Sequence, residues 1–231
     1  MMCARRLHAV LLGGALVTRL GVAHAEPLGS HQPHVEASLG VRVSKVPSAG
    51  YDPFADSDEL LQVSLGVGAT ALRADRFSLA GVGFWDYGGH SGQARGEGTA
   101  LTTQRLTVGP EFRYHVATPV YVFVHALPAF AFTQTSLDDD VIAATRYARH
   151  WSYGVDGAAG AAVELYGRRS GESIQPRLWA IAEGGYGYLS STHLGLKPDP
   201  NSGAPERTAS IDLGSLSLSG PYLRVSCAVS F

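Results

Sequence analysis

The chain has 231 residues, with 18 basic and 20 acidic side chains, two cysteines and 28 glycines. Because neither charge is in large excess, no basic face is expected, and nucleic acid is excluded as a natural partner. Mean hydropathy is close to zero, at +0.03. Beyond the first 25 residues no stretch is apolar enough to form a membrane-spanning helix.

The start of the chain has the pattern of a secretory signal peptide. Arg5 and Arg6 give it a positive beginning, residues 9–17 are apolar, and residues 23–25 (Ala-His-Ala) form a small-x-small cleavage site. A spanning helix would need ~20 apolar residues. The run here is shorter and is followed by Arg19, so export fits better than anchoring.

This reading divides the chain into a signal peptide at 1–25, an N-terminal tail at 26–33 and one folded domain at 34–231. Three arginines and no acid leave with the signal, so 15 basic and 20 acidic residues remain, a net charge of −5. Cys227 becomes the only cysteine, and no intrachain disulfide can form. The remaining length suits a single all-β domain.

The mature chain alternates between apolar and polar residues in segments separated by turn-rich stretches, and a period of two predicts β-strands. Eight strands are expected, at 34–46, 60–71, 77–87, 105–116, 120–135, 152–167, 177–189 and 222–231. Long loops are expected at 47–57, 88–98, 136–150 and 190–212, in alternation with short turns. An even number of strands with long loops at one end and short turns at the other predicts an antiparallel up-and-down transmembrane barrel.

The last strand shows the alternation most clearly. One face carries Leu223, Val225, Cys227, Val229 and the terminal Phe231. Chain ends are usually frayed and polar. An apolar row that ends on an aromatic ring instead suits a strand whose outer face contacts lipid and whose ring lies at the membrane interface.

The sidedness of the pattern favours a membrane protein over a soluble one. In the strands with a clear phase, no residue on the apolar face is Asp, Glu, Lys or Arg, although 16% of the chain is charged. A lipid-facing Arg or Lys at the bilayer midplane costs ~2–4 kcal/mol, which explains that exclusion. A soluble barrel around an apolar ligand would need the reversed pattern and would expose these apolar residues to water.

Two features within the strands are irregular. Pro110 and Pro128 fall in strand interiors, where the missing N–H predicts a β-bulge at each position. The phase of strand 77–87 stays open, because glycines interrupt it. Its outward residues are either Ala80, Val82 and Phe84, or Leu79 and Trp85.

The face expected to line the lumen holds most of the charges. These candidate site residues are Glu36, Arg42, Arg105, Glu111, Arg113, His125, Asp156, Glu164, Glu183 and Arg224. An eight-stranded barrel is only wide enough for its side chains to fill, so acids and arginines should pair into a plug. A narrow path for water or small solutes is the alternative. Acid–base catalysis is disfavoured because so tight a lumen admits no sizeable substrate.

Together, the signal peptide, the eight alternating strands, the one-sided loops and the terminal Phe231 resemble the small OmpA/OmpX-type outer-membrane β-barrel proteins. The resemblance covers about residues 33–231 and is architectural. It implies a monomer integrated in the outer membrane of a Gram-negative bacterium, with outer-membrane lipid and lipopolysaccharide around it. It also implies insertion by the barrel assembly machinery, which reads a C-terminal signal that Leu223, Val229 and Phe231 would supply here.

The resemblance further implies a structural or surface-interaction role, in which the loops contact an unknown ligand. A minority of such barrels modify lipid A, and a serine hydrolase among them needs Ser, His and an acid together. Loop candidates are His90 with Ser91, His150 with Ser152, and His193 with Ser190 or Ser191. No diagnostic motif surrounds these pairs, so no catalytic residue is expected. No cofactor or metal is expected either, since the histidines lack ligand spacing.

Two expectations concern the edges of the membrane. Residues 138–149 begin with acids and end with arginines, an order that suits either a short helix or a flexible loop. Aromatic side chains should gather at the two membrane interfaces. The expected members of these belts are Tyr114, Trp151, Tyr186, Tyr188 and Phe231.

Overall fold

The computed structural model describes residues 35–94, 97–117, 119–139, 144–166, 176–198 and 210–231. The predicted signal peptide and the N-terminal tail lie outside these residues. Residues 33–231 form one compact unit. Within the described ranges, no helix is long and apolar enough to cross a membrane.

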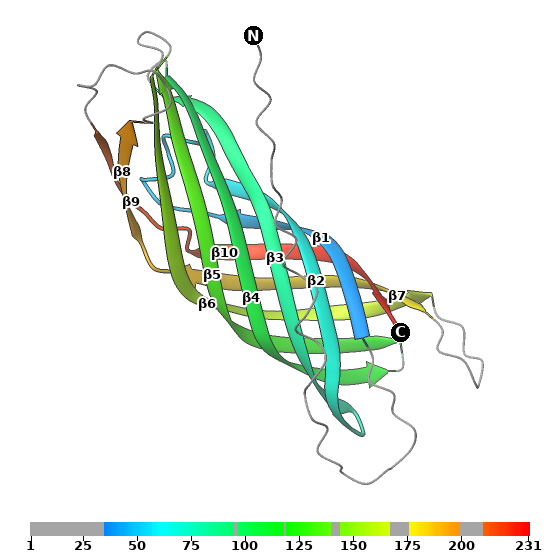
Figure 1. The fold of residues 1–231 in the computed structure, drawn as a ribbon. Coiled ribbons are helices and arrows are strands. Elements are labelled where there is room, and N and C mark those ends of the chain that lie inside the picture. Colours follow the sequence, from blue (N-terminus) through cyan, green and yellow to red (C-terminus); the bar gives the residue numbers. More distant parts are fainter. Residues whose placement is uncertain (1–34, 95–96, 118, 140–143, 167–175, 199–209) are drawn as a thin grey trace, which may run out of the picture. The chain divides into compact units, whose positions relative to one another are not determined.

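The described residues form ten strands, eight of which close into an antiparallel barrel (Figure 1). The strands are β1 (Val35–Lys45), β2 (Glu59–Ala74), β3 (Phe77–Ala94), β4 (Glu97–Ala117), β5 (Val120–Asp139), β6 (Ala144–Tyr166), β7 (Arg177–Leu189), β8 (Thr192–Pro198), β9 (Ile211–Leu216) and β10 (Gly220–Ser230). Neighbours in sequence pair from β1 to β7, then β7 pairs with β10 and β10 with β1. The predicted eight-stranded barrel is therefore confirmed, with no open edge in its wall.

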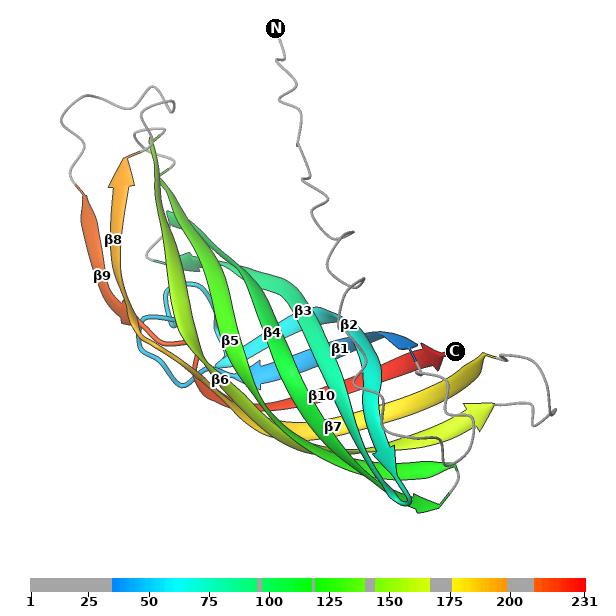
Figure 2. The same cartoon turned by 60° about the horizontal axis from the view of Figure 1, so that its bottom comes forward.

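The barrel has two unlike ends. The end called here the turn end holds the β2–β3 and β4–β5 connections and the two chain ends of the barrel, where Val35 and Phe231 exchange backbone hydrogen bonds. At the opposite end, called the loop end, β3 to β6 rise above the remaining strands (Figures 1 and 2). There β8 and β9 form a hairpin, attached to β6 through Tyr147 opposite Lys197.

Apolar side chains cover the outside of the barrel. Leu39, Val67 and Val225 are each more than half exposed, whereas Arg42 and Arg224 on the same strands are buried inside. The structure also settles the phase of β3. Leu79 and Trp85 face out, whereas Ala80 and Val82 are buried. A surface of this kind is stable only against lipid, so the fold is that of a transmembrane barrel.

Exposed aromatic rings lie at two levels of this outer surface. One set lies toward the loop end and the other at the turn end, as expected for the two interfaces of a bilayer. The loop-end set is Trp85, Tyr87, Phe130, Trp151, Tyr153, Tyr186 and Tyr188, and the turn-end set is Phe77, Phe112, Tyr166 and Phe231. Tyr114, also expected there, is half-buried and packs on Phe77.

Two of the predicted loops are mostly strand. The β3–β4 pairing continues to Ala94 opposite Glu97, and the β5–β6 pairing to Asp139 opposite Ala144, so the expected loops at 88–98 and 136–150 are wrong. The short helix considered for 138–149 is not formed by residues 138–139 and 144–149, which belong to β5 and β6, while residues 140–143 lie outside the described part of the chain. Outside the bilayer the outer face no longer needs apolar residues, so the hydrophobic alternation fades while the hydrogen-bonded ladder continues.

The predicted bulges at the two prolines are also wrong. The β4–β5 ladder keeps one register on both sides of a gap between Thr107–Ala129 and Glu111–His125. By that register Pro110 and Pro128 both fall in this gap, so the missing N–H groups interrupt pairing without shifting it. The bulges of the barrel wall lie elsewhere, near the turn end of β2, β4 and β6.

An apolar core, called here the loop-end cap, fills the barrel above the membrane-facing zone. Tyr51 and Phe54 from the predicted 47–57 loop are fully buried in it, and the β8–β9 hairpin adds Leu194 and Leu196. The Tyr51 hydroxyl donates to the carbonyl of Glu59 at 3.1 Å, and burial raises the pKa of that hydroxyl. Cap members contributed by the barrel strands include Leu60, Leu101, Leu137, Ala148 and Leu189.

Placing one charge on the outer face of the barrel tests whether that face contacts lipid. Val225 lies at the centre of β10 and is 55% exposed, so Val225→Arg should lower the free energy of unfolding by ~2–4 kcal/mol. Val35→Arg at the first residue of β1 should cost only ~0–1 kcal/mol, because the interface is close. Urea titration of folding into lipid vesicles measures both variants. Equal costs at the two positions would contradict the membrane orientation.

Candidate functional site

Charged side chains fill the middle of the barrel as one connected group, called here the central ion cluster. Its members are Arg42, Asp86, Arg105, Asp156, Glu183 and Arg224. They come from six different strands, each at an inward position of the alternation. All six side chains are at most 5% exposed, so three arginines and three acids share a space nearly closed to solvent.

Each acid of the central ion cluster bridges or binds an arginine. Arg42 Nη1 donates to Asp86 Oδ2 at 3.0 Å and to Asp156 Oδ2 at 2.7 Å. Arg224 donates to Asp86 Oδ2 at 2.9 Å and to Glu183 Oε1 at 2.6 Å. Arg105 pairs with the second oxygen of Asp156. The equal numbers of opposite charges offset the cost of removing each ion from water.

Ring and backbone features hold the arginines in place. Arg42 lies over the ring of Tyr222, with Cζ 3.8 Å from the ring centroid, and Arg224 lies over Phe84 at 4.1 Å. Gly187 faces the same space from β7. A Cβ atom there would lie 2.6 Å from Arg105 Nη2 and 2.9 Å from Asp156 Oδ1, so the cluster fits because this position has no side chain.

A second group, the turn-end ion cluster, lies between the central ion cluster and the turn end and consists of Glu36, Glu111, Arg113 and His125. Arg113 forms a two-bond pair with Glu36 and donates through Nε to Glu111 Oε1 at 2.7 Å. His125 Nδ1 lies 3.1 Å from Glu111 Oε2. The two clusters flank a cavity of about 20 Å³ lined by Glu36, Glu111 and Glu183 among others, which is room for about one water molecule.

The structure places nine of the ten predicted residues in these two clusters. Glu164, the tenth, is half-buried near the turn end of β6 and joins none of the ion pairs among the described residues. Asp86 is absent from the predicted residues, although it contacts two arginines. Alternation alone leaves the phase of strand 77–87 open, whereas the rule that charges face inward fixes that phase from Asp86 itself.

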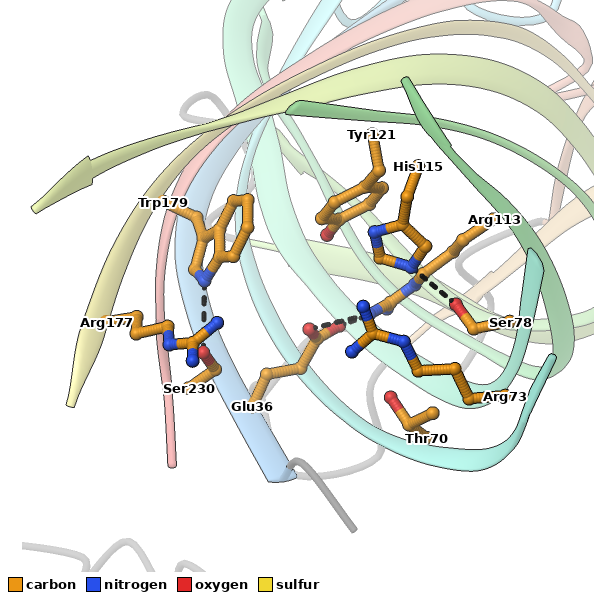
Figure 3. Close-up of a pocket in the computed structure, with 10 residues that line it drawn as sticks. All are labelled: Glu36, Thr70, Arg73, Ser78, Arg113, His115, Tyr121, Arg177, Trp179 and Ser230. Atoms are coloured by element: carbon orange, nitrogen blue, oxygen red, sulfur yellow. Dashed lines mark hydrogen bonds and ion pairs between the residues drawn. The ribbon is translucent and has the colours of Figure 1, made fainter. Parts of the chain in front are cut away.

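The candidate serine–histidine pairs of the loops are not hydrogen-bonded in the described residues. Within the described ranges, no hydrogen bond links His90, His150 or His193 to a serine. His193 lies 3.3 Å from Asp212 on the exposed hairpin, and Ser190 Oγ accepts a bond from the Tyr153 N–H. Among these residues a serine–histidine bond occurs instead at the turn end, where Ser78 Oγ and His115 Nε2 are 2.9 Å apart (Figure 3).

Removing one acid from the central ion cluster should strongly destabilise the protein, because it leaves buried positive charge without a partner. Asp86→Asn leaves Arg42 and Arg224 with one charge fewer between them, and we expect unfolding free energy to fall by ~3–5 kcal/mol. Asp52→Asn in the β1–β2 loop is the matched control, because Asp52 is exposed, and it should change stability by less than ~0.5 kcal/mol. Urea unfolding in vesicles compares them, and an equal effect would refute a paired interior.

Comparison with known proteins bears on the fold. No protein-family model matches the sequence, and no curated protein matches it in sequence. Among solved structures, a major outer membrane protein from Thermus thermophilus is 12% identical with a TM-score of 0.51, over 87% of this chain and 100% of that chain. Ail, the attachment invasion locus protein of Yersinia pestis, is 10% identical with a TM-score of 0.46, over 87% and 100%. Neisserial surface protein A is 11% identical with a TM-score of 0.38, over 86% and 95%.

At these identities the likeness concerns the fold and not the activity. Together with the apolar exterior and the charged, paired interior, the similarity to the Thermus structure identifies the architecture: the chain folds as a small β-barrel of the outer-membrane type.

Proposed function

We propose that this protein is an integral outer-membrane barrel with a closed lumen, which acts as a structural or surface-contact protein through its loop end. The observation that carries the proposal is the filling of the interior in successive layers. The turn-end ion cluster, the central ion cluster and the loop-end cap follow one another along the barrel. In this proposal the predicted charge network is a plug, and it has no catalytic role.

The loop end supports a contact role because hydrogen bonds join segments there that are far apart in the sequence. Ser217 N–H donates to Ser48 Oγ at 3.1 Å, and Thr99 Oγ1 donates to the carbonyl of Pro53 at 2.7 Å, which ties the β1–β2 loop to its neighbours. Segments that are already tied to one another lose less conformational entropy when they bind a partner. Its ligand is a surface molecule outside the cell, and its surroundings are outer-membrane lipid and lipopolysaccharide.

The C-terminal residues support insertion by the barrel assembly machinery. Leu223 and Phe231 are each more than half exposed on the outer face of β10, where a receptor could read them before the barrel closes. We propose these two residues, with Val229 between them, as the assembly signal.

Planar-bilayer recording tests the closed lumen. Purified protein inserted into the bilayer should give no stable single-channel steps, because each charged group of the central ion cluster has an oppositely charged partner and the cap above it is apolar. Insertion is checked separately by protease protection in vesicles made from the same lipid. Reproducible conductance steps from inserted protein would overturn the closed lumen.

Cysteine labelling on intact cells tests which end faces outward. In a Cys227→Ser background, Asp52→Cys places a thiol on the β1–β2 loop and Arg76→Cys places one on the β2–β3 turn. A membrane-impermeant maleimide should label the first in intact cells and the second only after the outer membrane is opened. Labelling in the reverse order would contradict the proposed loop-out orientation.

A further inference from the structure

A β-bulge near the turn end of β2 directs the side chain of Arg73 toward the inside of the barrel. Along β2 the residues with odd numbers, such as Val67, face lipid, and Arg73 would follow them. The register shifts between Thr70 and Leu72, after which Leu72 is 64% exposed and faces out instead. Arg73 is therefore aimed inward, opposite Ser78. Bulges commonly re-aim a side chain in this way beside functional sites.

Arg73 lines a pocket at the mouth of the turn end (Figure 3). The pocket has a volume of about 70 Å³. A cavity needs ~10–15 Å³ of such space to hold one water molecule, so the pocket suits several waters or one tetrahedral oxyanion. Figure 3 shows the guanidinium groups of Arg73 and Arg177 directed into the pocket from opposite sides of Glu36.

The pocket holds positive charge that no acid among the described residues pairs. Glu36 is the one acid among the lining residues, and Arg113 already binds both of its carboxylate oxygens. Within the described part of the chain, neither Arg73 nor Arg177 takes part in an ion pair or hydrogen bond. As far as the described residues go, two guanidinium groups in one concave site are thus available for an anion.

Hydroxyl donors complete the site. Ser230 Oγ accepts a hydrogen bond from Trp179 Nε1 at 3.0 Å, which leaves the Ser230 hydroxyl proton free to donate. Thr70 adds a second hydroxyl to the lining. Forked arginine donors with neutral hydroxyls match the several oxygens of a phosphate group better than a halide or a single carbonyl.

We infer that the turn-end pocket binds a phosphate group, held by Arg73 and Arg177 with the Ser230 and Thr70 hydroxyls. The group belongs either to a free phosphate anion in the periplasm or to a phospholipid headgroup of the inner leaflet. The pocket opens at the level of the aromatic residues Phe77 and Phe112, where a headgroup would lie. This binding site is independent of the loop-end contact role proposed above.

Calorimetric titration of the full protein in maltoside micelles, which contain no phosphate, tests the inference. One arm uses inorganic phosphate and the other uses dihexanoyl-phosphatidylglycerol below its micelle concentration. Saturable binding is expected in at least one arm. Arg73→Gln or Arg177→Gln should weaken it at least tenfold, which is ~1.4 kcal/mol, while Arg73→Lys should weaken it less because the charge stays.

Arg76→Gln is the matched control, because Arg76 lies three residues further on, in the β2–β3 turn, and does not line the pocket. It should bind like the wild type, and β-sheet circular dichroism confirms that every variant is folded. Binding in the phosphate arm identifies a free anion, and binding in the lipid arm alone identifies a headgroup. The inference is overturned if neither probe saturates, if Arg73→Gln and Arg177→Gln bind normally, or if Arg76→Gln loses as much affinity as they do.

Discussion

A polar group inside a bilayer has no water to bind, so a spanning chain must satisfy every such group from within. The closed ladder of the eight wall strands does this for most of the backbone. The central ion cluster does it for the charges, since each carboxylate there meets at least one guanidinium. The backbone ladder and the central ion cluster both depend on closure of the barrel, because only a complete cylinder brings six strands around one axis.

The central ion cluster also links parts of the wall that are not neighbours. Arg42 on β1 reaches Asp86 on β3 and Asp156 on β6, so these ion pairs cross the lumen instead of following the ladder. Such cross-links resist both flattening of the barrel and slippage of its register. Gly187 shows that the wall is shaped for them, since a larger residue would occupy the space of two charged groups.

The two ends of the barrel use different chemistry. The loop end is closed by an apolar core to which Tyr51, Phe54 and the β8–β9 hairpin contribute. The turn end combines charged side chains with a small apolar cluster around Tyr121 and Trp179, and a bulge in β2 directs Arg73 into a pocket there. One end is therefore suited to present a fixed surface, and the other to hold an anion at the membrane interface.

The sequence alone determined the membrane barrel, its eight wall strands and the inward position of residues such as Arg42 and Arg224, because period-two alternation is local and lipid excludes charge from one face. It could not determine which charges meet, since Arg42 and Asp156 are 114 positions apart and are joined only by closure. Nor could it locate the bulge that turns Arg73 inward, the strand pairing above the bilayer or the burial of Phe54. Those depend on the register of neighbouring strands and on contacts between distant segments, which leave no periodic signal along the chain.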